Sequence, residues 1–122
     1  MPFQYALLRA VPRVDRGEQV NVGLVLYCQQ AEFLDCLVRV RADRLRALDP
    51  ETDVAAISAA VAAFERWCHT PVGSARHGSG LATRFGMLVA PRSTVLQPGP
   101  VHAGLTDAPA DTLGRLVRRL VD

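Results

Sequence analysis

Three runs of apolar residues near the start of the chain have the length and composition of β-strands. They cover residues 3–11, 20–28 and 32–40 and are rich in valine, leucine and aromatic residues. The polar segment 12–19 separates the first two runs, whereas only residues 29–31 separate the second from the third. Because so short a connection cannot hold a parallel crossover, we expect the second and third strands to form an antiparallel hairpin.

The hydrophobic pattern also predicts the register of this hairpin. With a three-residue loop, Leu24 lies opposite Cys36, and the paired residues on that side form one wholly apolar face. A register shifted by one residue would bring Asp35 and Arg39 into the apolar row. We therefore expect the register that pairs Leu24 with Cys36.

Helical spacing replaces the strand pattern after residue 41. Residues 43–48 suit a short helical turn, and Asp49 followed by Pro50 predicts the start of a long helix over residues 50–68. A second helix is expected over residues 108–121, with Asp107 as its N-cap. Apolar residues recur at steps of three and four along the two helices, namely Val54, Ile57, Val61, Phe64 and Cys68 in the first and Leu113, Leu116, Val117 and Leu120 in the second.

The segment between these helices begins with a stretch that has few apolar residues. Residues 70–83 contain three glycines and two serines, which predicts a long surface loop, either a lid or a poorly ordered excursion. Residues 84–90 alternate as a fourth strand would, with Phe85 and Met87 on one face. Residues 93–97 are expected to add a short fifth strand.

Together these elements predict a single α+β domain over residues 1–122. Its centre is an antiparallel sheet of four or five strands. The long central helix and the C-terminal helix are expected to pack on one apolar face of that sheet.

Composition excludes several classes of protein. Apolar residues make up 49% of the chain and charged residues 21%, so the chain is too hydrophobic to be disordered. All 14 basic residues are arginine, which excludes a Schiff-base lysine and the lysine of a phosphate-binding P-loop. A net charge of +2 argues against nucleic acid as a partner. We expect a cytoplasmic location, without membrane contact, because the chain shows neither a membrane-spanning apolar run nor a secretion signal.

The cysteines and histidines give no sign of a metal site. Cys28, Cys36 and Cys68 are irregularly spaced, and the chain contains no CxxC, His-x-His or HExxH motif. We therefore expect no metal, no cofactor and, in a reducing compartment, no disulfide.

Two polar segments, residues 16–21 and 92–94, carry most of the candidate functional residues. An arginine in each segment offers a guanidinium fork that suits phosphate or carboxylate groups. A histidine after the second segment is the best candidate for a general acid or base, because its ordinary pKa lies near neutrality. We expect the two segments to lie close together as one polar recognition surface; the alternative is that their side chains cap turns or are solvated. The candidate residues are Arg16, Glu18, Asn21, Arg92, Ser93, Thr94 and His102.

Two long stretches of the chain resemble a known family. They are RGEQVNVGLVLYC at residues 16–28 and APRSTVLQPGPVHAGLTDAP at residues 90–109, supported by YALLR at 5–9 and RLRALDP at 44–50. They resemble the bacterial family of domains of unknown function numbered 3037, and the likeness covers nearly the whole chain. The family has no assigned catalytic residues. Its members resemble small cytoplasmic proteins often encoded beside HipA-type kinases, which implies such a kinase as a partner.

Two classes of function follow from these observations. The favoured one is a non-enzymatic interaction or accessory module, with a HipA-type kinase or a second copy of the chain as its partner. The alternative is a small enzyme or ligand-binding domain that acts on an anionic substrate through the candidate residues.

Overall fold

A five-stranded antiparallel sheet forms the centre of the computed structural model, which describes residues 1–72 and 80–122. Its strands are β1 (Pro2–Ala10), β2 (Val20–Cys28), β3 (Phe33–Val38), β4 (Leu96–Pro98) and β5 (His102–Leu105). The order across the sheet is β3-β2-β1, and both β4 and β5 then pair with β1. The α+β class and the antiparallel sheet are as predicted.

Strands β4 and β5 together form one interrupted edge of the sheet. Strand β4 pairs with the segment Leu8–Ala10 of β1, and β5 pairs with the segment Pro2–Tyr5. Pro98 ends β4 and Pro100 lies within the interruption, and a proline has no N–H to donate to a neighbouring strand. Between them, the N–H of Gly99 still donates to the carbonyl of Leu7 at 2.8 Å.

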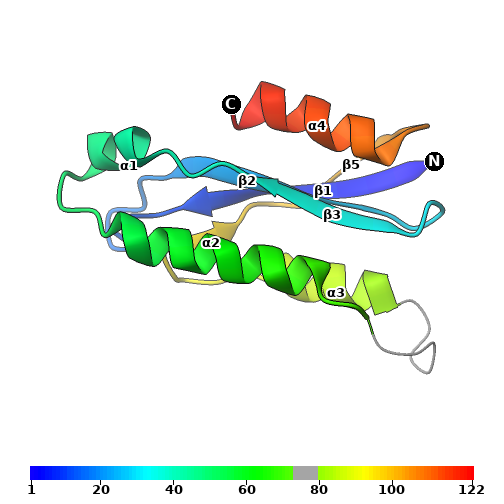
Figure 1. Ribbon diagram of the computed structural model, residues 1–122, viewed down its shortest axis with the longest axis horizontal. Coiled ribbons are helices and arrows are strands. Elements are labelled where there is room, and N and C mark those ends of the chain that lie inside the picture. The colour runs from blue at the N-terminus through cyan, green and yellow to red at the C-terminus, as the bar shows by residue number, and fades with distance from the viewer. Residues whose placement is uncertain (73–79) are drawn as a thin grey trace.

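In the described part of the chain, helices cover the sheet on both faces. They are α1 (Ala42–Leu48), α2 (Val54–His69), α3 (Gly80–Leu88) and α4 (Pro109–Leu120). Helices α2 and α3 lie on one face and α4 lies on the other, so the domain has three layers (Figure 1). Both long helices were predicted, but the expectation that they share one face is wrong.

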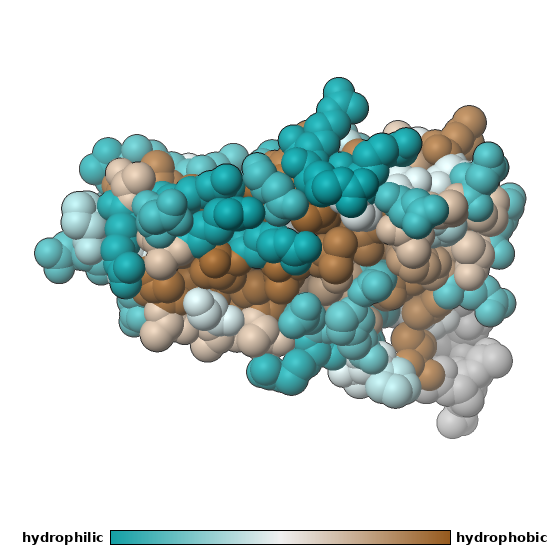
Figure 2. All heavy atoms as spheres, turned by 45° about the horizontal axis from the view of Figure 1, so that its top comes forward, coloured by the Kyte–Doolittle hydropathy of each residue, from teal (hydrophilic) through white to brown (hydrophobic). Residues whose placement is uncertain are grey.

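Two apolar cores result from this arrangement. Under α2 and α3, the core contains Ala6, Leu8, Val25, Tyr27, Cys36, Val61, Phe64, Phe85 and Leu88, among others. Under α4, it contains Phe3, Leu24, Leu26, Cys28, Leu113, Val117 and Val121. Strand β2 is apolar on both sides because it contributes to both cores. The outer surface around α4 is hydrophilic, with hydrophobic atoms visible between the helical layers (Figure 2).

The hairpin register differs from the prediction by one residue. Leu24 lies opposite Leu37, and Val25 lies opposite Cys36. The loop holds four residues, 29–32, and ends at Glu32 with a positive φ of 50°. Because the sheet has an apolar core on each face, the hairpin does not have to gather its apolar residues on a single face. Because β3 is an edge strand, Asp35 can turn outward from its place opposite Leu26.

Residues 84–90 are mostly helix rather than a fourth strand. Phe85 and Leu88 are buried, whereas Met87, predicted to share a face with Phe85, is 49% exposed. The ring of Phe85 stacks on Tyr27 with centroids 5.4 Å apart. Leu81, Phe85 and Leu88 follow helical spacing, which a short apolar run can mimic as alternation.

The remaining differences concern loops and helix ends. Helix α2 begins at Val54 because Asp53, and not Asp49, caps it by accepting a hydrogen bond from the N–H of Ala56 at 3.0 Å. Helix α4 has no side-chain cap from Asp107. The N–H of Ala108, the residue before the helix, donates to the hydroxyl of Thr106. Of the predicted loop 70–83, residues 80–83 belong to α3, and 73–79 lie outside the described residues.

Candidate functional site

Arg16 and Glu18 pair with each other in the loop between β1 and β2. The Nε atom of Arg16 lies 2.7 Å from the Glu18 carboxylate, and both side chains are about half exposed. Each charge is therefore partly neutralised by the other, in a solvated position where such a pair adds little stability.

Asn21 has a structural contact. Its side-chain Nδ2 atom donates to the carbonyl of Leu120 at 3.1 Å. That carbonyl lies in the last turn of α4, where carbonyl groups have no hydrogen-bond donor within the helix. Asn21 thus ties strand β2 to the end of α4.

Arg92 and Thr94 lie together beside α2. The guanidinium of Arg92 donates to the carbonyl of Met87 at 2.8 Å and stacks 5.3 Å from the centre of the Trp67 ring. The hydroxyl of Thr94 donates to the carbonyl of Leu96 at 2.8 Å, and neighbouring Ser93 is exposed. Arg92 and Thr94 line an open cavity of about 270 Å³ whose other walls are apolar residues: Ala60, Ala63, Phe64, Trp67 and Leu96.

His102 is on β5, with its ring 5.2 Å from that of Tyr5. Directly after β1, the N–H of Val11 donates to the carbonyl of Val95, next to Thr94, at 2.7 Å. Arg92 and Thr94 share a cavity, and Arg16 and Glu18 share an ion pair. Asn21 and His102 make their contacts elsewhere, so the described part of the chain does not gather the seven side chains into one cavity.

Within the described residues, β5 pairs only with β1, so its outer edge has no neighbouring strand there. The N–H of Thr106 donates to the carbonyl of Met1 at 2.8 Å, and in an antiparallel ladder the residues that face a neighbour alternate. Ala103 and Leu105 therefore direct their N–H and C=O groups away from β1. Leu105 is 78% exposed and Val101 is 42% exposed. Sequence reasoning missed this edge because it did not place residues 101–105 in the sheet.

At the opposite edge, β3, side chains occupy two of the backbone groups. The carboxylate of Asp35 accepts a hydrogen bond from the N–H of Cys36 at 2.7 Å, and the guanidinium of Arg39 donates to the carbonyl of Val38 at 2.9 Å. Charged residues that occupy backbone groups are a common protection against unwanted strand pairing. The two edges of the sheet are therefore chemically different.

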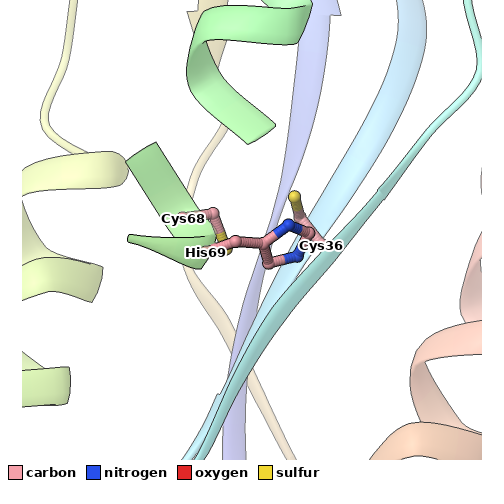
Figure 3. A group of neighbouring side chains, drawn as sticks. All are labelled: Cys36, Cys68 and His69. Carbon is pink, nitrogen blue, oxygen red and sulfur yellow. The ribbon is translucent and has the colours of Figure 1, made fainter. Parts of the chain in front are cut away.

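A second group of reactive side chains lies where α2 ends against β3. Cys36 comes from β3, Cys68 and His69 come from α2, and their sulfur and nitrogen atoms lie within 4.8 Å of one another (Figure 3). Both cysteines are free and buried. A hydrogen bond with Cys68, together with burial, raises the pKa of the Cys36 thiol.

This group was missed because its members are far apart in sequence. The only hint is that Asp35 adjoins Cys36 and Cys68 adjoins His69. The helix–strand packing that unites the two pairs is not visible in their spacing.

No helix within residues 1–72 and 80–122 is both long enough and apolar enough to cross a membrane. Comparison with known proteins finds no match among curated proteins and none among solved structures. The family described as "Protein of unknown function (DUF3037)" matches residues 5–121, which agrees with the resemblance noted in the sequence. The chain therefore belongs to the DUF3037 family.

Proposed function

We propose that this domain is a protein-interaction module that pairs the open edge of β5 with an extended strand of a partner protein. The observation that carries the proposal is the contrast between the two sheet edges. Asp35 and Arg39 occupy two backbone groups at the β3 edge, whereas Ala103 and the exposed Leu105 direct backbone groups outward from β5 that have no partner among the described residues. An added strand would complete the backbone hydrogen bonds of such an edge.

The side chains along this edge indicate the chemistry of the partner strand. Residues 93–106 contain no Asp, Glu, Lys or Arg, so the β5 strand itself offers no charged side chain to a partner. Val101, Ala103 and Leu105 alternate along the strand and share one face. We therefore expect the partner segment to be uncharged and to carry apolar residues at alternate positions.

A neighbouring pocket supports selectivity for one side chain of that segment. It has a volume of about 320 Å³ and lies beside Ala103, with Phe3, Gln4, Tyr27 and Gln29 among its other walls. In strand addition, the backbone supplies affinity and such pockets supply specificity.

The first partner to test is a HipA-type kinase, which the family resemblance suggests. The two proteins would meet in the cytoplasm. The anion-binding alternative has weaker support. Arg16 already pairs with Glu18, and Arg92 already contacts the Met87 carbonyl and Trp67, so neither guanidinium is held ready for an anion.

The test is co-expression with the HipA-type kinase of the same host, followed by size-exclusion chromatography with light scattering. We expect a complex that Ala103→Pro abolishes, because proline removes the outward N–H while an edge strand tolerates it. Leu105→Arg should weaken the complex as well. Val14→Arg is the matched control, since Val14 is 45% exposed but lies in the loop after β1.

The outcomes separate the two parts of the proposal. A complex that survives both β5 variants would refute the role of this edge. If the kinase does not bind, the choice of partner is wrong. A concentration-dependent dimer of the domain alone that Ala103→Pro dissociates would identify a second copy as the occupant of the edge.

A further inference from the structure

Four polar side chains converge where the last turn of α2 meets β3. Three of them, from Cys36, Cys68 and His69, place one sulfur or nitrogen atom each within 4.8 Å of the others, and the ring of His69 extends from α2 toward Cys36 on β3 (Figure 3). The two thiols are buried, whereas the side chain of His69 is 49% exposed. The group is thus closed on the sulfur side and open to solvent on the imidazole side.

Asp35 determines which imidazole nitrogen is available. Its Oδ1 atom lies 2.5 Å from Nε2 of His69 and also accepts the N–H of Cys36 at 2.7 Å. A carboxylate only accepts hydrogen bonds, so Nε2 of a neutral ring carries the hydrogen and Nδ1 carries the lone pair. A carboxylate that orients a histidine in this way is the usual outer partner of a metal-binding histidine.

We propose that Cys36, Cys68 and His69 bind a Zn²⁺ ion, with Asp35 as a positioning residue and with water in the fourth coordination place. Two thiolates and one imidazole form a donor set that zinc prefers in proteins. A buried cysteine pair alone would be a packing feature. The oriented histidine beside the pair, on the solvent side, is what points to a cation.

The required movements are small and the protons balance. Zinc lies about 2.3 Å from sulfur and about 2.0 Å from nitrogen, so tetrahedral ligand atoms are roughly 3.5–3.8 Å apart. Side-chain rotation can bring atoms now within 4.8 Å to that separation. The two thiol protons leave to solvent as the ion binds, and the neutral His69 keeps its hydrogen on Nε2.

Cobalt(II) is the probe for the first experiment. The reduced, chelator-treated domain is titrated with Co²⁺, and absorption is followed in the sulfur-to-metal charge-transfer and visible d–d regions. We expect one equivalent to give both sets of bands with the intensity of a four-coordinate site, and one equivalent of Zn²⁺ to remove them. The absence of a charge-transfer band in the reduced wild-type domain would overturn the proposal.

Variants then assign the ligands. Cys36→Ser and Cys68→Ser should each lose the saturable charge-transfer band. His69→Gln should do so too, and because this side chain is half exposed, the variant tests the site with little risk to folding. Cys28→Ser is the matched control, since Cys28 is also buried but lies in the core under α4.

The positioning role of Asp35 has its own test. Asp35→Asn should keep the bands but lower Zn²⁺ affinity by about 10- to 100-fold, as loss of an outer-sphere carboxylate does elsewhere. Equal loss of the band in Cys28→Ser and Cys36→Ser would overturn the assignment of the ligands. Unchanged Zn²⁺ affinity in Asp35→Asn would overturn the role given to Asp35.

Discussion

The surroundings of Cys36 disfavour the charged form of its thiol. The hydrogen bond with Cys68 and burial are the main causes, and the negative charges of Asp35 and Glu65 add to them. All of these raise the pKa of Cys36 above its ordinary value of 9.0. The folded domain therefore holds this proton at a pH where the unfolded chain releases it.

The consequence is a loss of stability in alkaline solution. Below pH 9.0 the thiol is protonated in both states, so its stabilising effect is fully present; as the pH rises further, only the unfolded chain loses the proton, and the free energy of unfolding falls. One proton corresponds to about 1.4 kcal/mol per pH unit. We expect urea unfolding of the reduced, metal-free domain from pH 8 to 10 to show this decline, and Cys36→Ala to make it shallower. Equal slopes would contradict the assignment.

Several polar residues have roles that only the folded chain reveals. Arg44 donates to the carbonyl of Val121 at 2.8 Å, as Asn21 does to Leu120, while Arg39 and Arg41 lie 3.6 and 3.5 Å from the carboxylate of Asp122. These contacts hold the end of α4 and join residues some 80 to 100 positions apart. The sequence placed Asn21 at a candidate site for its chemistry, but could not indicate a partner so far along the chain.

At the scale of elements, strong local signals predicted well and weak ones did not. The first three strands and the two long helices were predicted because their apolar periodicity extends over many residues. Residues 84–90 failed because seven residues with Phe85 and Met87 fit either period. The hairpin register failed for another reason: it assumed that the polar Asp35 must avoid an apolar row, whereas an edge strand allows it to turn outward.

The start of α2 gives a test at this scale. Asp53 accepts a hydrogen bond from the N–H of Ala56, whereas Asp107 makes no side-chain hydrogen bond to any described residue before α4. We expect Asp53→Ala to lower the free energy of unfolding by about 1 kcal/mol, and Asp107→Ala to change it by less than about 0.5 kcal/mol. Chemical denaturation of both variants measures the difference. The reverse order would show that α4, and not α2, depends on its acidic residue.

At the scale of the whole molecule, strand β2 lies between two helical layers that pack on opposite faces of the sheet. The residues of β2 that face α2 and α3 belong to one core, and those that face α4 belong to the other. The sequence predicted both helices but not their separation. A β2 that is apolar on both faces, apart from Asn21 near its start, is the feature that indicates cover on both sides, because a sheet with one solvated face alternates apolar and polar residues.

This arrangement predicts independent local effects within one cooperative unit. Val61 in α2 and Val117 in α4 are both buried, at 2% and 1% exposure, on opposite faces of the sheet. Each valine-to-alanine change should cost about 1.5–3 kcal/mol, from lost apolar burial and the cavity left behind. Because the sheet separates the two sites and they share no side-chain partner, the double variant should lose the sum of the two within about 0.5 kcal/mol.

Both cores nevertheless include residues of β2, so both helical layers depend on this strand. We therefore expect all three variants to unfold in a single transition with an unchanged dependence on denaturant, measured by urea titration with fluorescence of Trp67 and far-ultraviolet circular dichroism. Trp67 lies in the α2 layer, so it reports on that layer, while the circular dichroism signal includes α4. If the two signals separate in the Val117→Ala variant, the α4 layer unfolds by itself and β2 does not couple the two cores.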